Sequence, residues 1–137
     1  MASFVAVLDA NVLYPAPVRD ILMEVAVDGT YQARWTERIH EEWIRNLLKK
    51  QPELDPALLR RAADLMNEAV PDCIVEGYEH LIDALSLSDP DDRHVLATAI
   101  TAKADVIVTF NLRDFPDDIL GQYDLEAQHP DEFLNHQ

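Results

Sequence analysis

The sequence of 137 residues has a single cysteine, no long apolar run and few basic residues. Because Cys73 is alone, no disulfide can form within the chain, which agrees with a reducing compartment. No apolar run reaches the roughly 18 residues that a membrane-spanning helix needs. The N-terminal residues MASFVAVLDAN show neither a basic leader nor a small-residue cleavage site. We therefore expect a cytoplasmic protein without membrane contact.

The shortage of bases is uneven along the chain. Residues 1–50 hold 7 acids and 6 bases, whereas residues 51–137 hold 19 acids and 5 bases, and the net charge is −15. Long-range attraction to a polyanion is poor for so acidic a protein, so any affinity for nucleic acid must be local or metal-assisted. Seven of the eleven bases lie between residues 34 and 61 and form a basic stripe.

The remaining composition is that of a folded protein. With 48% hydrophobic and 27% charged residues, the chain resembles a soluble globular protein rather than a disordered one. Its length suits one hydrophobic core, so residues 1–137 are predicted to form a single domain.

Strands and helices alternate in the predicted order of elements. Short apolar runs predict strands at residues 4–8, 31–35, 73–75, 106–109 and near Leu125. Helical spacing and capping residues predict helices at residues 18–26, 36–50, 55–70, 79–85, from Pro90 to about Ile100, and from Pro130. Residues 111–116 are predicted to be a loop. This alternation predicts an α/β fold with a parallel sheet covered on both faces.

Four acids lie where they could meet in such a fold. Asp9 closes the strand FVAVLD, Glu42 lies in the helix WTERIHEEW, Asp92 opens the helix after SDPD, and Asp114 follows the strand VIVTF. Ligands of open parallel sheets bind beyond the carboxyl ends of the strands. Hard oxygen ligands without a His or Cys set indicate Mg²⁺ or Mn²⁺. Two such ions can activate water for an in-line displacement at phosphorus.

The segments VLDANVLYP, DDRHVLATAITAKADVIVTFNLRDF and HPDEFL, with Thr36 six residues before Glu42, resemble the PIN-domain nucleases, especially the VapC-like toxins of bacterial toxin–antitoxin pairs. The resemblance covers essentially the whole chain. It implies a three-layer α/β/α sandwich with a mainly parallel central sheet and metal-dependent endoribonuclease activity on RNA.

The resemblance also assigns residues. The catalytic and metal-binding positions of the family fall on Asp9, Glu42, Asp92 and Asp114. Four further positions accompany them: Asn111 as an alternative or helper at the fourth acid, Thr109 beside the site, Thr36 where the family commonly has serine, and Asp91 as a competitor of Asp92. Because a helix turns about 100° per residue, only one of two adjacent acids is expected to face the site.

Partners follow from the same resemblance. It implies an RNA substrate, a cognate antitoxin that inserts an Arg or Lys among the acids, and a homodimer. Arg38, Arg45 and Lys49 of the basic stripe are candidate RNA contacts, although the stripe is equally explained as the solvated side of a helical hairpin.

Two other functions stay open. A PIN-like module without catalysis would suit the acidic charge and a basic partner. An Asp-based phosphohydrolase would use Asp9, but Asn11 stands where the haloacid dehalogenase signature needs a second Asp. The five histidines form no zinc pattern, and the sequence gives them no catalytic role.

Overall fold

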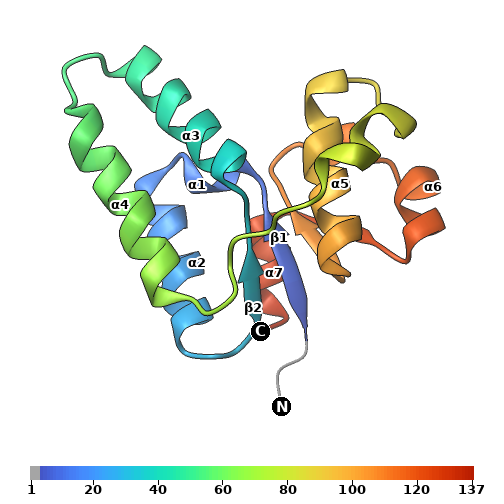
Figure 1. The fold of residues 1–137 in the computed structure, drawn as a ribbon. Coiled ribbons are helices and arrows are strands. Elements are labelled where there is room, and N and C mark those ends of the chain that lie inside the picture. Colours follow the sequence, from blue (N-terminus) through green and yellow to red (C-terminus); the bar gives the residue numbers. More distant parts are fainter. Residues whose placement is uncertain (1–3) are drawn as a thin grey trace.

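The computed structural model describes residues 4–137 and has a four-stranded sheet at its centre (Figure 1). The strand order is β2-β1-β3-β4, and every pairing is parallel. The strands are β1 (Val5–Leu8), β2 (Gln32–Arg34), β3 (Val106–Val108) and β4 (Glu126–Gln128). The mainly parallel sheet expected from the sequence is therefore confirmed.

Helices connect the strands. The α-helices are α1 (Ala10–Leu13), α2 (Ala16–Val27), α3 (Glu37–Lys50), α4 (Pro56–Ala69), α5 (Arg93–Ala102), α6 (Asp117–Leu120) and α7 (Pro130–Asn135). Short 3-10 helices are η1 (Glu79–Ala84), η2 (Pro90–Asp92), η3 (Leu112–Asp114) and η4 (Gly121–Tyr123). Among residues 4–137, no helix combines the length and apolar character that crossing a bilayer requires.

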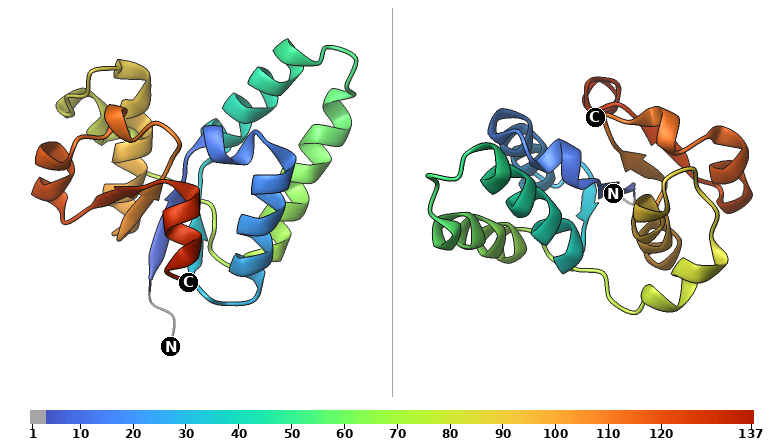
Figure 2. Two further views of the ribbon diagram at one scale, coloured as in Figure 1. Left: turned by 180° about the vertical axis from the view of Figure 1, so that it is seen from behind. Right: turned by 90° about the horizontal axis from the view of Figure 1, so that it is seen from above.

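The elements form three layers. Helices α1 to α4 lie on one side of the sheet and α5 lies on the other, as the views in Figures 1 and 2 agree. The strands β1 and β3 at the centre consist of apolar residues and are almost wholly buried between these layers. The α/β/α arrangement expected from the sequence is thus confirmed.

The hairpin of α3 and α4 is fixed by capping residues that the sequence identifies. Thr36 caps α3, its hydroxyl oxygen accepting from the amide of Ile39 at 3.0 Å. Asp55 caps α4 by accepting from the amide of Ala57 at 2.9 Å. Each cap satisfies a backbone donor that the first turn of a helix leaves free. The predicted starts of both helices are therefore confirmed.

The strand predicted at residues 73–75 does not form. Only Ile74 makes an isolated parallel bridge, and its partner is Trp35. The amide of Trp35 donates to the Cys73 carbonyl, and the amide of Val75 donates to the Trp35 carbonyl, both at 2.9 Å. Because Thr36 immediately begins the cap of α3, only Trp35 is left at the end of β2 for the segment to pair with.

Two further predictions are wrong in detail, and one is confirmed with a shorter type of helix. The short helix α1 stands before the first predicted helix, and α2 begins at Ala16, two residues before its predicted start. The small helix predicted at residues 79–85 is confirmed, and it is the 3-10 helix η1. The loop predicted at 111–116 contains η3. Short helical turns of this kind lack the long apolar period that makes helices visible in a sequence.

Candidate metal and active site

The candidate site lies where β1 and β3 end side by side at the centre of the sheet. From β1 the chain runs to β2 on one side, and it later returns to β3 on the other side of β1. Such a reversal of strand order opens a crevice beyond the carboxyl ends of the strands. Asp9 directly follows β1 and Thr109 directly follows β3. The sheet topology therefore brings together two residues that are far apart in the sequence.

Asp9 is held by a small polar network. Its Oδ1 accepts from the amide of Ala10 at 2.8 Å, and its Oδ2 accepts from the Thr109 hydroxyl at 3.0 Å. The Asn11 amide group donates to Asp9 Oδ2 at 3.3 Å and to Thr109 Oγ1 at 3.0 Å. Asn11 Oδ1 in turn accepts from the amide of Phe110 at 3.1 Å. The network joins the ends of β1 and β3 and fixes the Asp9 carboxylate.

Ionisation of Asp9 is disfavoured by its surroundings. The side chain is buried, and burial raises the pKa of Asp9 above its usual 3.8, because a charge is less stable away from water. The hydrogen bonds from Thr109 and Ala10 oppose this shift, and the nearby charge of Glu42 adds to it. A cation placed beside Asp9 would relieve both the burial cost and the repulsion.

Glu42 reaches the site from α3 and contacts α5. His94 Nε2 lies 3.0 Å from Glu42 Oε2, and the His94 ring is almost fully buried whereas Glu42 is 20% exposed. Glu42 and His94 also act electrostatically on Asp9, the first raising its pKa and the second lowering it. The carboxylates of Asp9 and Glu42 therefore belong to one electrostatic cluster.

Asp92 lies at the junction of η2 and α5. Its Oδ2 is buried and has no hydrogen-bond partner among the described residues. Burial raises the pKa of Asp92 to about 7. The charges that add to this shift are, in descending order, those of Asp9, Asp89, Asp114 and Glu42. The pKa of Asp92 is thus raised by the charges of all three other acids predicted for the site.

The fourth position has two candidates with different surroundings. Asp114 ends η3, is partly buried and repels Asp92. Asn111 is exposed, and its backbone amide is tied to the site by donating to Thr109 Oγ1 at 3.1 Å. The charge of Asp114 therefore acts on Asp92, whereas Asn111 is accessible to solvent.

The other predicted residues have different surroundings from the acids. Asp91 is exposed and Asp92 is partly buried, so the two adjacent acids differ in environment. The Thr36 hydroxyl is engaged in the cap of α3. The three basic candidates on α3 are exposed: Arg38, Arg45 and Lys49.

The cluster is not a closed metal cage. Across residues 4–137, no three His, Cys, Asp or Glu side chains already surround a point as cation ligands. The partnerless Asp92 Oδ2 is nevertheless a buried hard ligand without a hydrogen bond. Mg²⁺ usually keeps several waters and takes only one or two protein carboxylates. The residues therefore fit Mg²⁺ or Mn²⁺ held by few carboxylates and by water.

A family model described as PIN domain matches residues 5–113 of the chain. The chain belongs to the PIN domain family. The match contains Asp9, Glu42 and Asp92 and ends one residue before Asp114. This agrees with the resemblance identified in the sequence.

A curated relative is similar to part of this PIN domain. VapC50 of Mycobacterium tuberculosis, which is named as a ribonuclease, is 53% identical over 58 residues. The aligned segment covers 42% of this chain and 34% of VapC50, so the match spans about a third of the relative's length.

Two solved structures share the fold of this PIN domain. VapBC-1 from nontypeable Haemophilus influenzae matches with a TM-score of 0.58 at 18% identity, covering 93% of this chain and 99% of the other. VapBC2 from Rickettsia felis, bound to a DNA fragment from its promoter, matches with a TM-score of 0.58 at 15% identity, covering 92% and 98%. At these identities the likeness concerns the fold alone.

Two residues of this site are not identified by the sequence motifs. In the sequence, Asn11 serves only as evidence against a haloacid dehalogenase-type phosphohydrolase. In the structure, its side chain bonds both Asp9 and Thr109. The sequence assigns His94 no role, yet His94 contacts Glu42. A signal for His94 is present, because it falls within the apolar part of α5, where a buried polar side chain needs a partner.

Proposed function

We propose that this PIN domain is an Mg²⁺- or Mn²⁺-dependent endoribonuclease and the cytoplasmic toxin of a toxin–antitoxin pair. The observation that carries the proposal is that Asp9, Glu42 and Asp114 lie close enough to Asp92 for their charges to raise its pKa, at the carboxyl edge of the sheet. Acids whose charges raise one another's pKa are typical of functional sites, and a bound cation would relieve their repulsion. The similarity to VapC50 supports RNA as the substrate.

The four acids have separate roles in this proposal. Asp9 and Asp92 would hold the metal directly, and Glu42 and Asp114 would hold it directly or through water, with Asn111 as a helper. When bound, Mg²⁺ or Mn²⁺ would supply an activated water and would neutralise charge on the leaving oxygen of the phosphodiester.

The polar residues around Asp9 would support its role. Thr109 and Asn11 both donate to Asp9 Oδ2, so they keep the carboxylate in one orientation. Ligands that are fixed in advance lose little freedom when the metal binds.

Metal removal tests the proposal. We expect the purified protein to cleave single-stranded RNA with Mn²⁺ or Mg²⁺, to lose cleavage in EDTA and to recover it when Mn²⁺ is returned. Glu42→Gln should lower the rate at least about tenfold, because it removes one negative ligand. The measurement is gel analysis of a labelled RNA.

The matched control is Asp83→Asn, an exposed acid of η1, which should cleave as well as the wild type. A folded protein that binds no Mn²⁺ and cleaves no RNA would instead support a non-catalytic interaction module. Phosphate release from small phosphoesters without RNA cleavage would support a phosphohydrolase.

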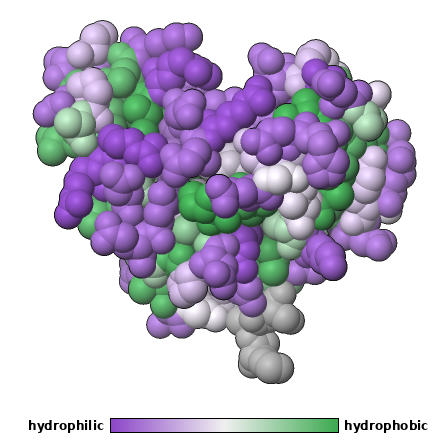
Figure 3. Space-filling model, viewed as in Figure 1, coloured by the Kyte–Doolittle hydropathy of each residue, from purple (hydrophilic) through white to green (hydrophobic). Residues whose placement is uncertain are grey.

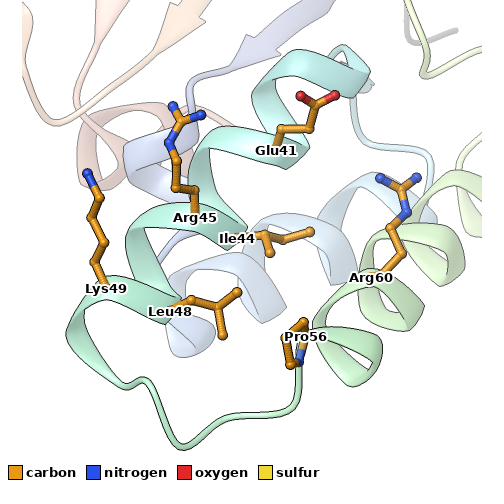
Figure 4. Close-up of a pocket in the computed structure, with 7 residues that line it drawn as sticks. All are labelled: Glu41, Ile44, Arg45, Leu48, Lys49, Pro56 and Arg60. Atoms are coloured by element: carbon orange, nitrogen blue, oxygen red, sulfur yellow. The ribbon is translucent and has the colours of Figure 1, made fainter.

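The basic residues of α3 offer a path for the RNA. Arg38, Glu42, Arg45 and Lys49 recur at helical spacing, so they follow one side of α3. Figure 4 shows the long side chains of Arg45 and Lys49 extending from α3. The surface is hollowed between this hairpin and the part that carries α5 (Figure 3).

The neighbouring Arg60 of α4 differs from these residues. Its guanidinium is engaged by Glu37 at 2.8 Å and by Asp64 at 2.9 Å. An arginine with two carboxylate partners has less positive charge to offer a phosphate. The proposed path therefore follows α3 rather than α4.

We expect Arg45→Ala to raise KM for RNA about three- to tenfold with little change in kcat, because a phosphate contact is lost far from the scissile bond. The salt dependence of log(kcat/KM) should become shallower by about one unit of slope. Arg61→Ala, which changes an exposed arginine of α4, serves as the control. Equal effects of both variants would reject a directed path.

The partners belong to the same proposal. An antitoxin that places an Arg or Lys among the four acids would supply the missing positive charge and block the metal. A homodimer is proposed on the same resemblance, and sedimentation velocity measures it directly.

A further inference from the structure

His94 is a buried polar side chain at the site to which the proposed mechanism gives no role. It is the second residue of α5, two positions after Asp92, and it is 1% exposed. Its Nε2 contacts Glu42 Oε2 at 3.0 Å across 52 residues of sequence. Its other ring nitrogen, Nδ1, is buried without a partner within the described residues. Among those residues, Glu42 is therefore the hydrogen-bond partner of the ring.

The direction of this hydrogen bond follows from the chemistry of its partners. A carboxylate only accepts, so His94 Nε2 carries the proton and donates it toward Glu42. The contact engages Oε2 of Glu42 and leaves Oε1 outside the bond to His94. One carboxylate oxygen is thus held by the protein while the other is available to a ligand.

His94 is firmly placed, whereas Glu42 has more freedom. The Thr98 hydroxyl donates to the His94 carbonyl at 2.7 Å within α5, and the residues that follow His94 in the helix are buried. Glu42 is partly exposed on α3, and a glutamate in that setting samples many rotamers, at an entropic cost when one is selected. A buried donor on a rigid helix removes that freedom before any ligand arrives.

We propose that His94 is a positioning residue that orients the Glu42 carboxylate for the metal. The inference rests on the proposed function and adds to it. His94 acts through Glu42 and does not itself bind the metal, because Nε2 is occupied and Nδ1 is buried away from solvent. Hydrogen-bond partners of metal ligands typically contribute about 10- to 100-fold to metal affinity.

Calorimetric titration with Mn²⁺ in the absence of RNA tests the inference. His94→Phe keeps an aromatic ring and removes the donor, so it should weaken Mn²⁺ binding about 10- to 100-fold. His94→Gln can place its amide nitrogen near the position of Nε2 and should bind within a few-fold of the wild type. Thermal unfolding of each variant verifies that the protein is folded.

A double-mutant cycle separates positioning from general support of the fold. If His94 acts through Glu42, His94→Phe should cause no further loss of Mn²⁺ affinity in the Glu42→Gln background. Equal losses in both backgrounds, or wild-type affinity in folded His94→Phe, would overturn the inference. Should His94→Phe fail to fold, His94→Asn replaces it, since its shorter side chain does not reach Glu42.

Failure of the proposed function has a different signature. If the proposed function is wrong, the wild type itself would neither bind Mn²⁺ nor cleave RNA. The positioning role of His94 would then be wrong as well. Failure of the His94 inference alone leaves wild-type binding and cleavage intact and appears only in the variants.

Discussion

The Asp92→Asn variant is expected to lose RNA cleavage by at least about a thousand-fold while becoming harder to unfold than the wild type in the absence of metal. The loss of activity follows from removing a charged ligand, because metal stabilisation of the transition state is worth several kcal/mol and about 4 kcal/mol corresponds to a thousand-fold rate change. Gel analysis of a labelled RNA measures it.

The gain in stability follows from the pKa of Asp92, which is raised from 3.8 to about 7. As pH rises from about 4 to 7, the unfolded chain ionises while the folded chain keeps its proton, so Asp92 lowers stability progressively over this window. At pH 8 the cost is on the order of 2 kcal/mol after allowance for partial solvent exposure. The substituted asparagine carries no charge at any of these pH values, so Tm should rise by about 5 °C or more.

Thermal unfolding in EDTA at pH 5 and pH 8 measures the effect, and the difference between variant and wild type should be smaller at pH 5. Added Mn²⁺ should stabilise the wild type more than the variant, because it binds the folded wild type more tightly. Asp83→Asn is the control for both measurements. A lower Tm for Asp92→Asn at pH 8 would contradict the repulsion among the acids, and retained cleavage would contradict the metal-binding role of Asp92.

The Asn67→Leu variant is expected to be severely destabilised although Asn67 lies on α4, outside the acid cluster. Asn67 Oδ1 accepts from Trp35 Nε1 at 2.8 Å and bonds His40 Nε2 at 2.9 Å. Leucine offers no acceptor, and each buried donor left unpaired costs about 1–3 kcal/mol. Total stability is usually about 5–15 kcal/mol, so a loss of this size lowers Tm by about 10 °C or more.

The tautomer of His40 is fixed by its neighbours. An indole nitrogen can only donate, and Trp43 Nε1 lies 2.9 Å from His40 Nδ1, so Nδ1 is unprotonated and Nε2–H donates to Asn67. Burial lowers the pKa of His40 below its usual 6.5. The stability that the neutral His40 ring contributes to the fold is therefore complete above about pH 6.5. It is lost as pH falls toward the lower pKa of the folded state.

Urea unfolding at pH 7.5 measures the Asn67→Leu effect, and Glu68→Leu at the neighbouring exposed position is the control. Proton NMR of the His40 ring measures its pKa directly. A stable Asn67→Leu protein, or a His40 pKa at or above 6.5, would contradict the network.

Local signals predict much of this fold. Thr36 and Asp55 mark helix starts because their side chains cap adjacent backbone amides, a relation contained within a few residues. The apolar runs before Asp9 and Thr109 mark the two central strands. Parallel pairing then brings the two run ends together, so the position of Asp9 beside Thr109 follows from a general rule about sheets.

Contacts between distant segments are not predictable in this way. The bond of His94 to Glu42 depends on how closely α3 and α5 approach across the end of the sheet, which no local pattern encodes. The single bridge of Ile74 to Trp35 depends on where α3 begins. The surroundings of Asn111 and Asp114 depend on the short turn η3, whose shape the sequence does not reveal.

The polar network around Asn67 has a consequence for how substitutions spread through the molecule. His40 and Glu42 are two residues apart on α3. The hydrogen bond of His40 to the side-chain amide of Asn67 therefore ties the helix that carries Glu42 to α4. A search for functional residues that ranked positions by distance from the acids would pass over Asn67. Substitutions at Asn67 would nonetheless weaken the attachment of α3 to α4, so the position of the Glu42 carboxylate depends in part on a residue of the neighbouring helix.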